Sequence, residues 1–158
     1  MTARDVKDLE AFLREQGSRA RLVRLEADTS TVGAAAEALG VPPERIIKSL
    51  VFIAGDEPVL VIAAGPDRVD RRRLAEVLGL PPGKVRLATP DEVLAATGFP
   101  VGGVPPVGHA RPLKVYVDRR VAEAPDAVFG GGGADRVLLE VEPAELIRLT
   151  GAEIVDLG

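Results

Sequence analysis

The sequence contains no cysteine and a single histidine among its 158 residues. Without cysteine, the protein can have neither a disulfide framework nor a catalytic thiolate, and one histidine argues against a zinc site. Its apolar runs fall short of the roughly 18 residues of a membrane span, and the N-terminal residues lack the apolar segment of a signal peptide. We therefore expect a cytoplasmic protein that has no contact with membranes and uses no metal ion or other cofactor.

Aromatic residues are also scarce, and acidic residues outnumber basic ones. Aromatic side chains make up 3% of the chain, so the core has to consist of Val, Leu, Ile and Ala. The hydrophobic fraction of 46% is typical of a compact globular protein, and the length predicts one domain over residues 1–158. A net charge of −4 argues against a broad basic coat for nucleic acids, although a local patch can still recognise one nucleic-acid end.

The chain consists of short apolar segments that alternate between helical and strand periodicity. Helical spacing predicts helices at residues 4–16, 32–39, 67–78, 90–97 and 143–149. Alternation or short apolar runs predict strands at residues 21–26, 49–54, 59–64, 85–88, 113–117, 137–141 and 154–155. Because hairpins mix with helical crossovers, we expect an α+β fold: a single domain with a mixed, strongly curved, barrel-like β-sheet flanked by helices.

Small polar residues indicate where several helices begin. The Asp-Thr-Ser sequence at residues 28–30 offers N-caps for the second predicted helix, and Asp70 is a plausible cap for the third. Thr89 and Glu92 have the spacing of a capping box, with Pro90 at the first helical position. Among the predicted helices, the one at residues 90–97 therefore has the best-defined start.

Residues 97–109 have the sequence Thr-Gly-Phe-Pro-Val-Gly-Gly-Val-Pro-Pro-Val-Gly-His, with four glycines and three prolines. Such a segment can neither continue a helix nor form a central strand. Its free N–H groups can face a carbonyl, hydroxyl or phosphate ligand, or it can be a long surface turn. A second glycine segment, residues 130–133, is either a flexible hairpin tip or a close-approach surface beside the first. Neither segment has the spacing of a dinucleotide or P-loop motif.

Lys48 and His109 are candidate chemical groups. Lys48 stands at the start of an apolar strand, where an ammonium is costly unless it reaches water or an anion. The alternative is a surface lysine whose ammonium lies in solvent. His109 is either a general base or a hydrogen-bonding residue that stiffens its loop, and the lack of a paired carboxylate in sequence favours the second. Residues 71–73 indicate a solvated helix face, with a phosphate-contacting patch as the less favoured alternative, and Asp118 is expected to order a turn.

The ordered pair of a Lys-Ser-Leu strand and a Gly-x-x-Pro-x-Gly loop resembles the YbaK/ProX family of aminoacyl-tRNA deacylases. This family is related to the editing domain of bacterial prolyl-tRNA synthetase. The resemblance extends over nearly the whole chain, and its residues are Thr31-Val32, Ala35-Ala36, Leu39-Gly40-Val41, Ile47-Lys48-Ser49-Leu50-Val51-Phe52, Thr97-Gly98-Phe99, residues 102–108 and Leu146-Ile147-Arg148-Leu149-Thr150-Gly151.

The resemblance implies a free-standing editing factor that hydrolyses the ester of a mischarged aminoacyl-tRNA, and a barrel-like α/β fold. Its substrate would be a small amino acid, with tRNA-Pro as a candidate tRNA and prolyl-tRNA synthetase as a candidate partner beside the aminoacyl-tRNA 3′ end. In this interpretation Lys48 is the catalytic side chain. The residues expected at the substrate are Thr31, Gly102, Gly103, Val104, Pro106, Gly108, His109, Gly131 and Gly132.

Two other functions fit the same residues. A non-catalytic module for tRNA ends or nucleotides would keep both loops and lack turnover. A partner-binding subunit would use the fold as a scaffold and fill the pocket. For the deacylase, small apolar walls at Leu25, Val32 and Val104 are expected to select the amino acid by size. The sequence leaves the oligomeric state open.

Overall fold

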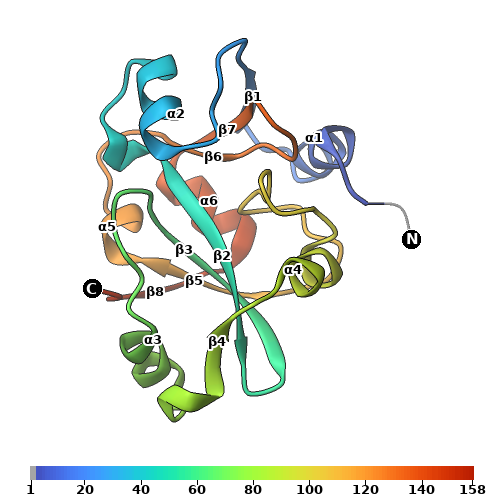
Figure 1. The fold of residues 1–158 in the computed structure, drawn as a ribbon. Coiled ribbons are helices and arrows are strands. Elements are labelled where there is room, and N and C mark those ends of the chain that lie inside the picture. The colour runs from blue at the N-terminus through green and yellow to red at the C-terminus, as the bar shows by residue number, and fades with distance from the viewer. Residues whose placement is uncertain (1–2) are drawn as a thin grey trace.

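The computed structural model describes residues 3–158 (Figure 1); the first two residues of the expected domain lie outside this range. Its helices are α1 Val6–Glu15, α2 Val32–Leu39, α3 Arg71–Leu78, α4 Pro90–Thr97, α5 Arg119–Ala122 and α6 Pro143–Thr150, with short 3-10 turns η1 Pro43–Arg45 and η2 Pro82–Lys84. Its strands are β1 Arg21–Arg24, β2 Ile47–Ala54, β3 Glu57–Ala64, β4 Val85–Leu87, β5 Lys114–Asp118, β6 Val128–Gly131, β7 Val137–Val141 and β8 Glu153–Val155. None of the helices in residues 3–158 has the length and apolar character needed to cross a membrane.

The strands form two sheets. A mixed sheet has the order β4-β2-β3-β5-β8, and a smaller antiparallel sheet has the order β1-β7-β6. The α+β class is confirmed, but a single strongly curved, barrel-like sheet is not. Within the described residues, the bridge recorded between β6 and the β2 segment is the isolated pair Ile46 and Phe129, so no continuous ladder joins the two sheets.

The central hairpin of β2 and β3 separates two apolar layers. One face of the mixed sheet packs with Leu9 of α1, Val93 of α4 and Leu146 of α6. The other face packs with Leu74 and Ala75 of α3. In Figure 1 this hairpin runs diagonally through the molecule, with α3 below and the small sheet above it. Its two-sided burial explains the nearly continuous apolar sequence of residues 59–64.

Local capping signals fix most helix ends. Asp70 accepts N–H bonds at the start of α3, and Thr89 with Glu92 forms the predicted capping box of α4. The second helix differs from expectation, because Thr31 and not one of residues 28–30 is its N-cap. Asp28 instead accepts from the N–H and hydroxyl of Ser30, which makes a separate tight turn and lowers the pKa of that carboxyl.

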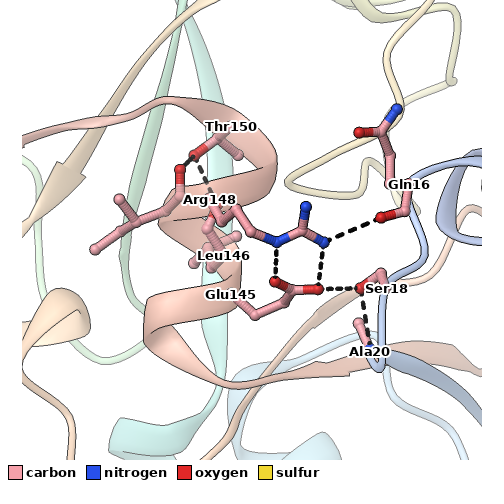
Figure 2. A network of polar contacts seen from close by, with 8 residues as sticks. Gln16, Ser18, Ala20, Glu145, Leu146, Arg148 and Thr150 are labelled. Carbon is pink, nitrogen blue, oxygen red and sulfur yellow. Dashed lines mark hydrogen bonds and ion pairs between the residues drawn. The ribbon is translucent and has the colours of Figure 1, made fainter.

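Helix α6 is tied to the segment that follows α1 by a polar network centred on Glu145 (Figure 2). Arg148 donates to both carboxylate oxygens of Glu145 and to the main-chain carbonyl of Gln16. Ser18 donates its hydroxyl to the same carboxylate at 2.6 Å. The bonds from Arg148, and then that from Ser18, lower the pKa of Glu145 to about 2. The network therefore connects elements about 130 residues apart in the sequence, and its bonds favour the ionised form of the Glu145 carboxylate.

Candidate functional site

A cavity of about 570 Å³ lies between the start of β2, the N-terminus of α2, the loop after α4 and the hairpin of β6 and β7. Most of its wall is aliphatic. Its polar side chains come from the turn that precedes α2 and from β2; they are Thr29, Ser30, Thr31, Lys48 and Ser49. Glycines contribute main-chain surface, namely Gly102, Gly103, Gly130 and Gly131. An apolar cavity with a few convergent polar groups is the usual form of a small-molecule site.

Lys48 and residues 102–104 line this one cavity although they are about fifty positions apart. The Lys48 ammonium donates to the main-chain carbonyl of Gly65 at 3.3 Å and to that of Asp67. Both acceptors lie in the loop that follows β3. An ammonium has three N–H donors, so one remains for a ligand. The half-buried ammonium is thus held by two carbonyls of the loop after β3, whereas Lys48 itself is among the residues that line the cavity.

Gly65 fixes this lysine-binding loop at the end of β3. Its N–H donates to the Ile46 carbonyl at 2.6 Å. A Cβ at this position would lie 2.7 Å from a methyl group of Val32, so the loop can approach α2 because residue 65 is glycine. Nothing in the sequence pattern singled out this glycine, because the contact depends on α2 folding back over the hairpin.

The two glycine segments contact one another directly. Gly133 donates its N–H to the Gly103 carbonyl at 2.9 Å, and a Cβ on Gly131 would lie 2.3 Å from the Val104 carbonyl oxygen. Residues 130–133 are therefore a close-approach surface beside the first loop, one of the two alternatives that the sequence left open. Gly102 has φ +107°, in the region that favours glycine, with no atom within 4 Å of the position that its Cβ would take.

The structure places four of the expected substrate-binding residues outside the wall of this cavity. Pro106, Gly108 and His109 line a different cavity of about 430 Å³ near α1. The chain turns inward after Val104, and Gly108 packs against Leu9, where a Cβ would lie 3.0 Å from a methyl group. Gly132 donates to the Val137 carbonyl at 2.9 Å and closes the hairpin. These four residues shape the loop ends, whereas residues 102–104 and Gly131 reach the cavity.

His109 makes the contact expected of a loop-stiffening residue. Its Nε2 lies 2.7 Å from the Pro105 carbonyl oxygen, and because a carbonyl only accepts, Nε2 carries the proton. Burial, followed in size by the opposing effect of this bond and by the nearby Arg4 charge, leaves the pKa of His109 lowered. The neutral ring thus bonds to its own loop at Pro105 and lies outside the wall of the cavity that residues 102–104 line.

Thr31 and the aliphatic wall remain in the cavity. Thr31 Oγ1 accepts from Ala34 N–H at 3.0 Å, which leaves its hydroxyl proton available. Val32 and Val104 line the cavity as expected, but Leu25 does not; it packs with the cluster around α2 and Phe129. Sequence reasoning missed Ser49, whose signal was a lone hydroxyl next to Lys48 in an apolar strand.

The comparisons identify one family over most of the chain. Residues 26–149 match the sequence profile of the aminoacyl-tRNA editing domain. The chain is 34% identical over 134 residues to the Bacillus subtilis protein named "Uncharacterized protein YwhH", covering 84% of this chain and 83% of that protein. It is 40% identical over 112 residues to the proline–tRNA ligase of Solidesulfovibrio magneticus, covering 71% of this chain but 19% of the synthetase.

Solved structures of similar size share the fold. The structure of a candidate trans-editing enzyme for prolyl tRNA synthetase superposes with a TM-score of 0.89 at 37% identity, covering 99% of this chain and 98% of that one. The structure of hypothetical protein APE2540 superposes with a TM-score of 0.86 at 36% identity, covering 95% and 98% of the two chains.

Proposed function

The chain belongs to the aminoacyl-tRNA editing domain family, and we propose that it hydrolyses the ester of mischarged aminoacyl-tRNA as a trans-acting factor. The observation that carries this proposal is the single cavity lined by Lys48 and residues 102–104. Trans action is supported by the structural neighbour described as a candidate trans-editing enzyme, which this chain matches over nearly the whole length of both. The proposed domain comprises residues 1–158.

In the proposed reaction, a water molecule adds to the ester carbonyl carbon. The bond to the ribose oxygen then breaks. One proton of the added water goes to that oxygen and the other to solvent as the amino acid leaves as its carboxylate. Negative charge develops on the carbonyl oxygen, so N–H donors preorganised at that point lower the barrier. The main chain at residues 102–104 supplies such donors. The remaining N–H of Lys48 polarises the carbonyl or holds the terminal phosphate.

An aminoacyl ester is already reactive, so positioning together with oxyanion stabilisation is sufficient chemistry. Because Val32 and Val104 narrow the cavity, the expected substrate is a small amino acid, with tRNA-Pro as the candidate tRNA. An aliphatic wall discriminates by only about 1–3 kcal/mol per methylene, so alanyl and seryl esters should both be accepted. The proposed partners are the 3′ end of the aminoacyl-tRNA and prolyl-tRNA synthetase.

The test is a panel of mischarged tRNAs carrying small, branched and aromatic amino acids, each incubated with excess protein in single-turnover conditions. The proposal requires accelerated release of at least one small amino acid. Binding of the same tRNAs without acceleration would instead identify a non-catalytic module that recognises tRNA ends.

A further inference from the structure

Strand β2 has an open edge inside the cavity, and Ser49 lies on it. On one side, β2 pairs along its whole length with β3. On the other side, β4 pairs with residues 52–54, and Ala88 N–H donates to the Val51 carbonyl at 2.9 Å. The next backbone pairing on that side, among residues 3–158, is the bridge between Ile46 and Phe129. The intervening edge at Ser49 has no strand partner in the described chain.

The main-chain N–H and carbonyl of Ser49 point toward this open edge. In an antiparallel strand, the two groups of one residue face the same edge, and successive residues alternate. The Ile46 carbonyl accepts from Gly65 on the β3 side, whereas the Val51 carbonyl accepts from Ala88 on the opposite side. Ser49 is two residues from Val51 and three from Ile46, so its main-chain groups share the side of Val51, along the cavity wall.

The Ser49 hydroxyl is also unpaired. Its Oγ is buried and has no hydrogen-bond partner among the residues that the structure describes, while the residue as a whole is partly exposed. A buried hydroxyl without a partner costs free energy that a ligand can recover. Rotation about the Cα–Cβ bond moves this oxygen between staggered positions. One residue therefore offers three polar groups within a largely aliphatic wall.

We propose that an α-aminoacyl group binds this edge as a strand of one residue. Its α-amino group donates to the Ser49 carbonyl and hydroxyl, and its ester carbonyl accepts from the Ser49 N–H. This inference rests on the proposed function and names the groups that hold the reacting ester. An α-amino ester carries one donor and one acceptor at the spacing of a single residue, which is what a hydrogen-bonded antiparallel pair exchanges.

This arrangement also determines where the amino acid side chain and the ester carbonyl of the substrate lie. Paired residues on adjacent strands direct their side chains to the same face of the sheet. The amino acid side chain then lies on the face of Ser49 and Val51, against the aliphatic wall that includes Val104. The ester carbonyl lies at the Ser49 N–H, which adds a donor to those of residues 102–104 where the oxyanion forms.

The experiment compares the best substrate of the panel with its deamino counterpart, which for alanine means alanyl-tRNA against propionyl-tRNA. Single-turnover rates are divided by the uncatalysed hydrolysis rate of each ester, because the ammonium itself activates the ester. The proteins are wild type, Ser49→Ala and Ser30→Ala. Ser30 is a matched serine of the same cavity whose hydroxyl already donates to Asp28 at 3.0 Å.

Wild type should accelerate the amino ester at least about tenfold more than the deamino ester, as expected for charge-assisted hydrogen bonds. Ser49→Ala should reduce this preference severalfold with a melting temperature no lower than that of wild type, and Ser30→Ala should leave the preference at the wild-type value. Equal acceleration of both esters by wild type would overturn the inference while leaving the deacylase intact. An equal loss on both esters in Ser49→Ala would also overturn it. No acceleration of any ester would refute the proposed function itself.

Discussion

Replacing Lys48 with alanine tests the charge at the centre of the proposed site. The ammonium donates to the Gly65 and Asp67 carbonyls, and its third N–H is the one proposed to reach the substrate. Loss of one oxyanion-stabilising donor commonly lowers the rate about a hundred- to a thousandfold. We expect a loss of that size for Lys48→Ala in single-turnover hydrolysis of the best mischarged tRNA.

The same substitution removes two hydrogen bonds inside the protein, so its effect on folding must be separated from its effect on rate. The side chain is partly exposed, and a typical hydrogen bond contributes about 0.5–1.5 kcal/mol. A destabilisation of about 1–3 kcal/mol leaves a protein of ordinary stability folded. Thermal unfolding of each variant, followed by circular dichroism, verifies that rates are compared between folded proteins.

Two further variants sharpen the result. Lys48→Arg keeps the charge, but its wide, forked guanidinium cannot reproduce the compact geometry of the ammonium between two carbonyls, so little activity should return. Lys84→Ala is the matched control, because Lys84 is exposed and lies outside the cavity wall. If Lys48→Ala hydrolyses the ester as fast as wild type and Lys84→Ala, then Lys48 is structural and the proposed mechanism is wrong.

Three other predictions concern the polar network centred on Glu145, the contact between Gly131 and Val104, and the size selectivity of the cavity. The pKa of Glu145 in the folded protein is about 2, below its ordinary value of 4.5, so its contribution to stability is present above pH 4.5 and is lost as the pH falls toward 2. Denaturant melts should therefore show a smaller acid-induced loss of unfolding free energy for Glu145→Gln than for wild type. Equal losses in the two proteins would refute this role. Gly131→Ala should destabilise the protein by about 1–3 kcal/mol or more, because its Cβ would meet the Val104 carbonyl, whereas Gly83→Ala, with open space at its Cβ, should melt near wild type. Alanyl- and seryl-tRNA should be hydrolysed faster than aromatic aminoacyl-tRNA in the same single-turnover assay; equal rates would exclude selection by size.

Much of the fold is encoded by local signals that sequence alone reveals. The capping box at Thr89 and the apolar hairpin of β2 and β3 appear where they were predicted. The strand β6 was missed because two of its four residues are glycines, which have low strand propensity. The helix α5 was missed because its four residues, Arg119–Ala122, are too few for a periodic pattern.

The division into two sheets depends on pairing between distant segments, which no local pattern records. Strand β1 pairs with β7, more than a hundred residues later. Likewise, the open edge at Ser49 exists because β4 ends at Leu87 and β6 diverges after its bridge to Ile46. A strand sequence indicates which faces are buried, but it does not indicate which edge lacks a neighbour.

The two glycine segments contact each other in the structure, whereas the sequence pattern was interpreted as contact with a ligand. Glycine allows close main-chain approach, and from sequence that approach was assigned to a ligand. In the structure, Gly131 lies against the Val104 carbonyl and Gly133 bonds to Gly103. Much of the close main-chain approach therefore occurs between the two glycine segments themselves. These contacts fix the backbone of residues 102–104 along the cavity. Substitution of Gly131 or Gly133 should therefore change the reaction rate, because it would displace residues 102–104 and their N–H donors. Oxyanion stabilisation requires those donors to be preorganised.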